Sequence, residues 1–261
     1  MDLNLTAHVA VVTGGASGIG RAAVDAFRAE GCRVAVWDLQ PPADVAAMCD
    51  RFVRCDVSEW ESVQQALIET EKSLGPVDHL VHAAAIGSGH FGFPFTEIPV
   101  EAWPRVLEVN ILGMTHIAHA VAPGMRERKA GTCVFVASVA GQIGSPTDPP
   151  YSASKAANIN FAQCLAKDLA PFGVRVNTVC PGMVQTPLNR RVWQGWHDRQ
   201  PPELRKTYED WAGEKVRQIV PLQRWQTPAD IANMIVFLSS ERAAQVTGQT
   251  INVDGGFVMH W

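Results

Sequence analysis

Tyr151 and Lys155, in the segment Tyr151-Ser-Ala-Ser-Lys155, are spaced so that a helix would carry both side chains on one face, one turn apart. Ser138 stands thirteen residues before Tyr151. A phenol beside an ammonium, with a hydroxyl arriving from elsewhere, is a plausible acid/base site for moving a proton to or from an alcohol oxygen. Because tyrosine and lysine also meet at helical spacing by chance, this interpretation depends on the rest of the chain.

The composition is that of a folded enzyme-sized domain. Of the 261 residues, 47% are hydrophobic and 18% are charged, which is enough apolar surface for a full core. The 22 basic and 26 acidic residues give a net charge of −4 without a basic block. Nucleic acid and anionic membranes are therefore not expected as partners.

The cysteines and the terminal segments carry no targeting or metal-binding pattern. The six cysteines are scattered at positions 32, 49, 55, 133, 164 and 180, with no Cys-x2-Cys pair. We therefore predict no metal site and expect reduced, buried thiols. The first residues show no secretory signal, and no apolar run approaches the roughly 18 residues of a membrane span. A cytoplasmic setting is expected.

A glycine-rich turn, Thr13-Gly-Gly-Ala-Ser-Gly-Ile-Gly20, separates the apolar run His8–Thr13 from the helix-like stretch Arg21–Glu30. A second apolar run, Arg33–Trp37, follows and ends at Asp38, so the pattern predicts a βαβ unit. Glycines let the backbone approach a pyrophosphate, which the N–H groups at the helix start then bind. A tight turn that binds nothing is the alternative. The acid 18 residues after Gly20, at the tip of the next strand, favours a dinucleotide site.

Asp38 also predicts which nicotinamide cofactor binds. A carboxylate accepts hydrogen bonds from the two adenosine ribose hydroxyls and repels the 2′-phosphate of NADP. Neither Trp37 nor Ser17 adds a positive charge. We therefore predict NAD(H).

Short apolar runs alternate with helix-like stretches to the end of the chain. Strands are predicted at 52–55, 79–83, 132–137, 174–180 and 249–253, and helices at 59–73, 100–125, 151–170 and 227–239. No linker or internal repeat interrupts the alternation, which predicts one doubly wound α/β domain over residues 1–261. Residues 188–220 are rich in tryptophan and charge and fit neither a strand nor a single amphipathic helix. We expect a small helical substrate lid at about 183–220.

In this order and spacing, the motifs closely resemble the short-chain dehydrogenase/reductase family, and the resemblance covers essentially the whole chain. They are the glycine turn at 13–20, Asp38, Asp56-Val57, Asn110, Ser138, Tyr151-x3-Lys155, Pro181-Gly182 with Thr186, and Gly248–Gly256. The resemblance implies a Rossmann fold with a seven-stranded parallel sheet, NAD(P)-dependent interconversion of an alcohol and a carbonyl, and usually a homotetramer.

The same resemblance implies roles for individual residues. Ser138, Tyr151, Lys155 and Asn110 match the family's catalytic tetrad, in which Tyr151 is the acid/base and Asn110 holds a water that connects Lys155 to solvent. Lys155 would tune Tyr151 and bind the nicotinamide ribose, while Ser138 would donate a hydrogen bond to the substrate oxygen. Besides Asp38, Tyr151 and Lys155, the implied cofactor contacts are Gly14, Ser17, Gly18, Ile19, Gly20, Asp56, Val57, Ala84, Val184 and Thr186.

One motif departs from the family pattern. The chain has His82-Ala-Ala-Ala85 where the family usually has Asn-Asn-Ala-Gly. Ala85 in place of glycine raises the question of whether this turn needs a positive φ. We interpret His82 as a polar residue satisfied within the turn, without a catalytic role.

The substrate is indicated only weakly. Gln142, Thr147, Asn189 and Trp193 mix polar and aromatic groups in the expected lid and loops, which favours a polyol, sugar or hydroxyketone. A 3-oxoacyl-carrier or acyl-CoA reductase is the alternative within enzymes. A non-catalytic NAD-binding regulatory protein is the alternative outside enzymes, but it predicts loss of Tyr, Lys or Ser. The apolar ending at 257–261 favours a subunit interface.

Overall fold

Seven parallel strands form one sheet in the order β3-β2-β1-β4-β5-β6-β7 in the computed structural model, which describes residues 2–42 and 44–259. The strands are β1 Val9–Thr13, β2 Arg33–Asp38, β3 Arg51–Arg54, β4 His79–His82, β5 Gly131–Val136, β6 Val174–Pro181 and β7 Thr250–Val253. Central strands such as β1 are buried along their whole length, as expected for a parallel sheet that is covered on both faces. The predicted fold class is confirmed.

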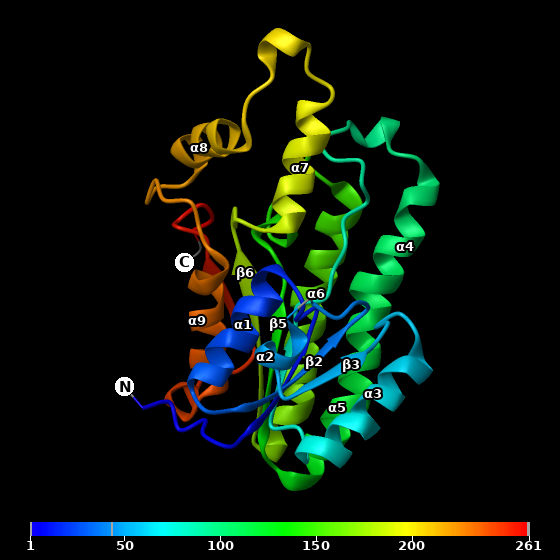
Figure 1. Ribbon diagram of the computed structural model, residues 1–261, viewed down its shortest axis with the longest axis vertical. Helices are drawn as coiled ribbons and strands as arrows, with labels where there is room; N and C mark the ends of the chain where they lie inside the picture. The colour runs from blue at the N-terminus through cyan, green and yellow to red at the C-terminus, as the bar shows by residue number, and fades with distance from the viewer. Residues whose placement is uncertain (1, 43, 260–261) are drawn as a thin grey trace.

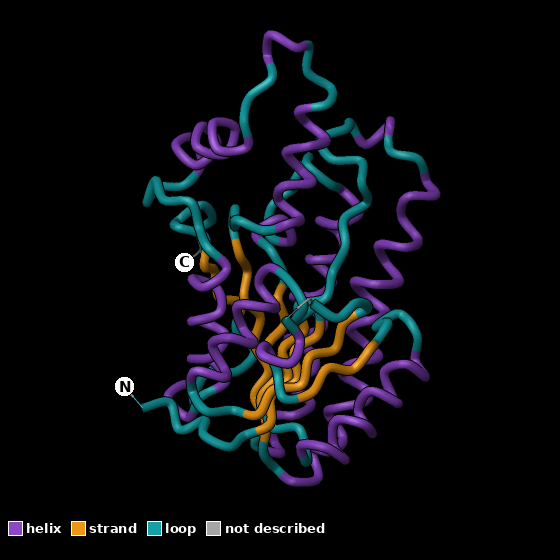
Figure 2. Tube along the Cα trace, in the orientation of Figure 1, coloured by secondary structure: helices purple, strands orange, loops and turns teal. Residues whose placement is uncertain are grey.

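Helices cover both faces of the sheet (Figure 1, Figure 2). The α-helices are α1 Gly18–Ala29, α2 Val45–Met48, α3 Trp60–Leu74, α4 Trp103–Leu107, α5 Gly113–Arg128, α6 Pro149–Leu169, α7 Pro187–His197, α8 Tyr208–Ile219 and α9 Pro228–Ser239. One apolar core packs α1 and α9 against one face, and a second packs α3, α5 and α6 against the other. The direction of connection reverses beside β1, which pairs with both β2 and β4. Ligands bind at such a point, beyond the carboxyl ends of the strands.

The helix predicted at 100–125 is interrupted. It consists of a 3-10 turn at Val100–Ala102, then α4, a π-helical turn at Glu108–Leu112, and α5. A π-turn inserts one residue into a helix, a change that hydrophobic periodicity does not reveal. Asn110 lies within this turn and is buried.

Residues 187–219 form two separate helices, α7 and α8, above the carboxyl ends of the strands (Figure 1). They have an apolar cluster of their own, in which Tyr208, Trp211 and Val216 of α8 are buried. Trp193 and Trp196 of α7 pack against this cluster. The prediction that this segment is not a single helix is therefore confirmed.

The C-terminal segment packs on its own chain. Phe257 and Val258 lie against the buried residues Ala137, Val139 and Cys180. Positions 260–261 of the predicted interface segment lie outside the described residues. A subunit contact through this segment stays a prediction.

His79, at the start of β4, predicts a loss of stability in acid. It is buried between His8, whose Nδ1 is 2.9 Å from His79 Nε2, and Thr132, whose Oγ1 is 2.8 Å from Nδ1. Burial, helped by His8, lowers the pKa of His79 to about 3. The unfolded chain binds this proton below about pH 6.5, so stability is complete above that pH and falls as the pH drops toward 3.

We expect His79 alone to account for a loss of about 2 kcal/mol between pH 6.5 and 5. Urea unfolding across this range should show a shallower pH dependence for His79→Gln than for the wild type. The exposed His119, changed to Gln, is the matched control and should follow the wild type. Equal slopes for His79→Gln and the wild type would contradict the assignment.

Candidate active site

The glycine turn between β1 and α1 is shaped by contacts that leave no room for a side chain. Gly14 has a φ of +66°, and a Cβ there would lie 2.8 Å from the Cα of Ala84. A Cβ on Gly20 would lie 2.2 Å from the carbonyl oxygen of Gly14. Ser17, the N-cap of α1, makes no side-chain cap hydrogen bond to the described residues. The start of α1 therefore fits a pyrophosphate, since its N–H groups are not occupied by the cap.

Asp38 lies at the carboxyl end of β2, against the glycine turn. One carboxylate oxygen accepts a hydrogen bond from the backbone N–H of Ala16 at 3.0 Å, and the other accepts from Leu39 N–H at 2.7 Å. Trp37 is buried, and its indole N–H donates to Thr70 Oγ1 at 2.9 Å. A carboxylate therefore stands at the edge of the cleft, where an adenosine ribose would meet it.

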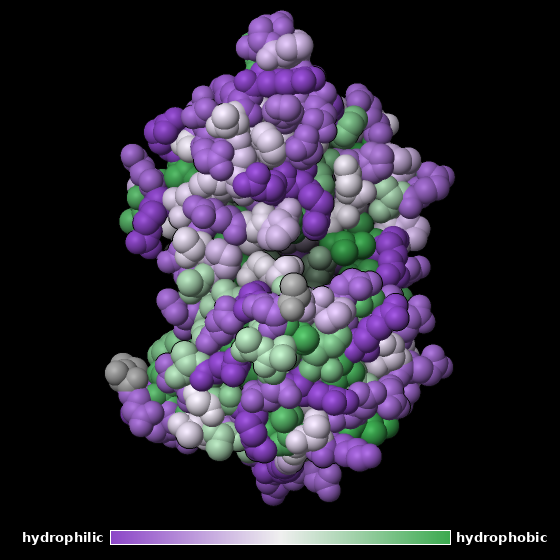
Figure 3. Space-filling view, viewed as in Figure 1, coloured by the Kyte–Doolittle hydropathy of each residue, from purple (hydrophilic) through white to green (hydrophobic). Residues whose placement is uncertain are grey.

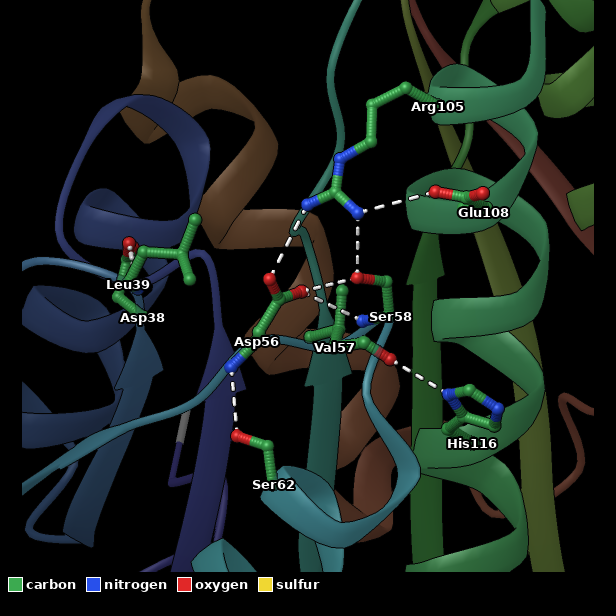
Figure 4. Close-up of polar contacts among 9 residues, drawn as sticks. All are labelled: Asp38, Leu39, Asp56, Val57, Ser58, Ser62, Arg105, Glu108 and His116. Carbon is green, nitrogen blue, oxygen red and sulfur yellow. Dashed lines mark hydrogen bonds and ion pairs between the residues drawn. The ribbon is translucent and has the colours of Figure 1, made fainter.

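Asp56 and Arg105 bound the neighbouring part of the cleft (Figure 4). Asp56 accepts hydrogen bonds from the backbone N–H of Ser58 at 3.0 Å and from its hydroxyl at 2.6 Å. Arg105 of α4 pairs with Asp56 across 3.3 Å and donates to Ser58 Oγ at 2.9 Å. The pKa of Asp56 is lowered because the hydrogen bonds from Ser58 and the charge of Arg105 outweigh burial. Asp56 is therefore anionic and held in one orientation.

Val57 follows Asp56 and is fixed from the opposite side. Its carbonyl oxygen lies 3.0 Å from Nδ1 of His116 on α5, as Figure 4 shows. A Cβ on Gly113, the first residue of α5, would lie 2.7 Å from Val57 Cγ2. The close packing of α5 on this loop thus sets the position of Val57 in the cleft wall.

Ser138, Tyr151 and Lys155 converge on the same cleft. Ser138 follows β5, and its Oγ accepts from Ala140 N–H at 3.1 Å. Because α6 begins at Pro149, Tyr151 lies in its first turn, as predicted, and Lys155 follows one turn later. The Lys155 ammonium is 5.5 Å from the centre of the Tyr151 ring and donates to the Val136 carbonyl at 2.7 Å.

Burial acts in opposite directions on the two charged forms of this pair. It raises the pKa of Tyr151 above that of a free phenol, while a hydrogen bond with Ser138 lowers it. It lowers the pKa of Lys155 to about 8. Below that pH the lysine is a buried cation beside the phenol, so it is the group best placed to favour phenolate.

Asn110 organises the loop that follows β4. Its amide oxygen accepts from Ile86 N–H at 2.9 Å, and its amide nitrogen donates to the Ile86 carbonyl and to Ser154 Oγ, both at 2.9 Å. Ser154 lies on α6 between Tyr151 and Lys155. Asn110 therefore joins the loop, the π-turn and α6.

The segment His82–Ala85, which departs from the family pattern, leads from the end of β4 into the cleft wall. Ala85 does not have a positive φ, so this turn does not require glycine at that position. His82 is buried, with Nδ1 2.9 Å from Thr13 Oγ1, but Nε2 has no partner among the described residues. The interpretation that His82 is satisfied within its turn is therefore wrong, because its one partner, Thr13, lies on β1.

The cleft has a volume of about 430 Å³ and is visible as a hollow at mid-height in Figure 3. Ser138 and every predicted cofactor residue line it: Gly14, Ser17, Gly18, Ile19, Gly20, Asp38, Asp56, Val57, Ala84, Tyr151, Lys155, Val184 and Thr186. The sequence motifs thus come together in one place. The roles of these residues toward cofactor and substrate are proposals.

The four predicted substrate residues are placed differently from one another. Asn189 lines the cleft, and its amide oxygen accepts from the Tyr208 hydroxyl at 2.9 Å. Gln142 donates to Asn252 Oδ1 at 2.7 Å. The indole N–H of Trp193 donates to the Lys206 carbonyl at 3.1 Å, within the helical segment above the sheet.

The remaining member, Thr147, accepts a hydrogen bond from Gly92 N–H at its backbone carbonyl. Of the four, only Asn189 is among the described residues that line the cleft. A substrate role for the other three stays a prediction.

Several residues that line the cleft were not predicted from the sequence. Leu39 lines it because it follows Asp38, and Arg105 lines it because α4 crosses near the end of β3. Arg191 lines it from the second turn of α7. Only the position of Leu39 beside the predicted acid could have been anticipated.

Residues 2–42 and 44–259 contain neither a candidate metal centre nor a candidate membrane-spanning helix. No three His, Cys, Asp or Glu side chains in these ranges are grouped so that they could hold a metal ion. No helix in these ranges is both long and apolar enough to cross a bilayer. All six cysteines are free thiols, and Cys164 alone is exposed.

The fold and the cleft define an oxidoreductase of the short-chain dehydrogenase/reductase family, to which the chain belongs. Residues 14–258 match the family described as enoyl-(acyl carrier protein) reductase. The chain is 32% identical over 254 residues to acetoacetyl-CoA reductase of Shinella zoogloeoides, covering 95% of this chain and 98% of that one. It is 35% identical over 263 residues to L-xylulose reductase of Bos taurus, covering 99% of both.

A solved structure supports the same assignment. Aldohexose dehydrogenase of Thermoplasma acidophilum, in ligand-free form, superimposes with a TM-score of 0.88 at 29% identity and covers 98% of this chain and 96% of that one. The protein is therefore an enzyme that acts on CH–OH groups with a nicotinamide cofactor. The non-catalytic alternative is set aside.

Proposed function

We propose that this enzyme interconverts a secondary alcohol and its ketone with NAD(H), with Tyr151 as the acid/base. The observation that carries the proposal is the convergence of Ser138, Tyr151 and Lys155 on the cleft that also contains the glycine turn. A nicotinamide cofactor held by the glycine turn, Asp38 and Lys155 would supply the hydride acceptor for oxidation of the carbinol carbon.

The side chains of the chain handle the proton. Tyr151, as phenolate, takes the proton of the substrate hydroxyl, and in the reverse direction the phenol returns it to the carbonyl oxygen. Ser138 donates a hydrogen bond to that oxygen. Lowering a phenol pKa from about 10 to about 7 takes about 4 kcal/mol of preferential stabilisation of phenolate. Lys155, whose ammonium lies 5.5 Å from the centre of the Tyr151 ring, and the hydrogen bond with Ser138 both favour phenolate.

The cofactor preference rests on Asp38. Its carboxylate, held by Ala16 N–H and Leu39 N–H, can accept hydrogen bonds from ribose hydroxyls and repels a 2′-phosphate. Arg21, the nearest basic residue along α1, forms ion pairs with Asp25 and Asp44 at 3.1 and 2.7 Å. These contacts support NAD(H) as the cofactor.

We expect Asp38→Ser combined with Leu39→Arg to raise the ratio of kcat/KM with NADPH to that with NADH by at least about tenfold, since a charged hydrogen bond is exchanged for an attraction to phosphate. Leu39 is 45% exposed, so arginine can be accommodated there. Initial rates with both cofactors measure the ratio. Leu39→Gln, which keeps the carboxylate, is the control. Equal use of NADH and NADPH by the wild-type enzyme would refute the role of Asp38.

For the substrate, we propose a polyol, sugar or hydroxyketone. The support is Asn189 at the cleft, with the polar and aromatic residues above it, and the similarity to an L-xylulose reductase and an aldohexose dehydrogenase. The test is a rate screen of secondary alcohols, polyols and sugars with NAD, in parallel with plain aliphatic alcohols. Preference for the aliphatic alcohols would overturn the proposed class.

A second candidate is a 3-oxoacyl-CoA or carrier-bound reductase, favoured by the similarity to acetoacetyl-CoA reductase. The net charge of −4 and the lack of a basic block in the sequence argue against an acidic carrier protein. Acetoacetyl-CoA with NADH or NADPH belongs in the same screen. Turnover faster than with any polyol would make this the function.

Two features extend the proposal. We assign residues 183–220 as the substrate lid, because α7 lines the cleft through Leu188, Asn189 and Arg191. We also expect a cytoplasmic homotetramer, by family resemblance. Light scattering should then give four times the 28.3 kDa chain mass.

A further inference from the structure

A buried polar layer lies behind Lys155, on the face of the sheet that α6 covers. His82 is 1% exposed and Asn158 is 0% exposed. His82 ends β4 and shares a face with Leu80, because residues two apart on a strand point the same way. Leu80 belongs to the same apolar core as Ala162, and Asn158 lies one turn before Ala162 on α6. Both polar side chains therefore point into the core between the sheet and the helices of this face, of which α6 is one.

Aromatic contacts connect the two positions. The His82 ring lies 6.0 Å from the Phe135 ring, and Phe135 lies 6.1 Å from Phe161, which is on α6 close to Asn158. The Lys155 ammonium binds the Val136 carbonyl, one residue beyond the last β4–β5 pair. The lysine is thus at the end of β4, and it is the charged group that faces His82.

The hydrogen bonds of Thr13 favour one tautomer of His82. Thr13 Oγ1 accepts from Ala84 N–H at 3.3 Å and lies 2.9 Å from His82 Nδ1. The hydroxyl uses its own hydrogen only if it donates to Nδ1, which places the imidazole proton on Nε2. Nε2–H is then a buried donor.

Asn158 presents the complementary group. Its Nδ2 donates to the Asn110 carbonyl at 3.1 Å, while its Oδ1 is a buried acceptor. Within the described part of the chain, neither His82 Nε2 nor Asn158 Oδ1 has a hydrogen-bond partner. A donor and an acceptor in one buried layer are costly to leave unpaired.

We propose that His82 is a positioning residue of this active site, whose Nε2–H holds Asn158 Oδ1 across one buried water. The bond fixes the Asn158 amide, which in turn holds Asn110 and, through it, Ile86 and Ser154 beside Lys155. The inference rests on the proposed function only for the role of Lys155. The proposal assigns a role to His82, which stands where the family usually has asparagine.

The first test reads the wild-type protein without reference to catalysis. Protein labelled with ¹⁵N-histidine should show His82 as a neutral Nε2–H tautomer in long-range ¹H–¹⁵N spectra at pH 7, with its signal assigned by loss in His82→Asn. Asn158→Leu should shift that signal. An Nδ1–H tautomer, or no shift in Asn158→Leu, would overturn the proposal.

The second test asks whether the two residues act as a unit. His82→Leu and Asn158→Leu should each lower kcat about tenfold and shift the pH–rate profile alike, and the double variant should be no worse than either single. Losses that multiply to about 100-fold would show independent effects and overturn the proposal. His82→Asn, which keeps a donor, should recover to within about threefold of wild type. If a Leu variant does not fold, the tautomer decides.

Failure of this proposal and failure of the proposed function give different results. An active Tyr151→Phe enzyme would remove the catalytic assignment and leave the His82 tautomer unaffected. An inactive Tyr151→Phe enzyme with an Nδ1–H tautomer at His82 would overturn the positioning role of His82 and leave the proposed function standing.

Discussion

Tyr151→Phe should lower kcat at least about 100-fold, because it removes the hydroxyl that we propose exchanges a proton with the substrate oxygen. The ring, the first turn of α6 and the glycine turn are unchanged by the substitution, so NADH binding should be retained. Steady-state kinetics with the best alcohol from the substrate screen, together with NADH fluorescence titration, measures both. Activity close to wild type would remove Tyr151 from its proposed role.

The chain supplies a matched control, since it contains two tyrosines. Tyr208→Phe removes the hydroxyl that donates to Asn189 Oδ1 in the helical segment above the sheet. The loss of one neutral hydrogen bond should cost about tenfold or less. A loss in Tyr208→Phe equal to that in Tyr151→Phe would mean that hydroxyl removal acts through structure rather than through proton transfer.

Lys155→Met should lower the oxidation rate near neutral pH by at least about 100-fold. A cation 5.5 Å from the Tyr151 ring favours phenolate by about 3 kcal/mol at an effective dielectric near 20, which is about two pKa units. Without that cation the pKa of Tyr151 rises further. Oxidation requires phenolate, so the rise of its rate with pH should move to higher pH.

The pH–rate profile of Lys155→Met separates this effect from a general loss of structure. A methionine that leaves the profile in place would contradict the electrostatic role. Lys155 also should bind the nicotinamide ribose, so the Kd for NADH should increase, whereas Tyr151→Phe should leave it unchanged. Lys167→Met, on the exposed face of the same helix, is the control and should match the wild type in both.

The sequence predicted those parts of the site that depend on local geometry. The strand and helix periods are properties of the backbone, so the apolar runs and the Tyr151-x3-Lys155 spacing were sufficient to place the elements. The glycines of the first turn indicated positions where a side chain would not fit. The structure shows why, because Gly14 lies close to Ala84 and Gly20 lies close to Gly14.

Contacts between segments that are distant along the chain could not be predicted from the sequence. The pairing of Arg105 with Asp56 joins residues 49 positions apart, and the π-turn that carries Asn110 follows from packing rather than from a pattern. Contacts made by loops and by the segment above the sheet are also hard to predict from sequence. The hydrogen bonds of Trp193 and Thr147 depend on how α7 and the loop before α6 pack on their neighbours.

By itself, then, the sequence predicted the alternation of strands and helices, the glycine turn and the Tyr151–Lys155 pair, because each depends on residues within a few positions of one another. Only the tertiary structure decided that Ala85 needs no positive φ, that Lys155 lies at the end of β4, and that His82 and Asn158 share one buried layer. Those outcomes depend on which side chains from separate elements fill the same space. That is set by packing across the sheet and not by spacing along the chain.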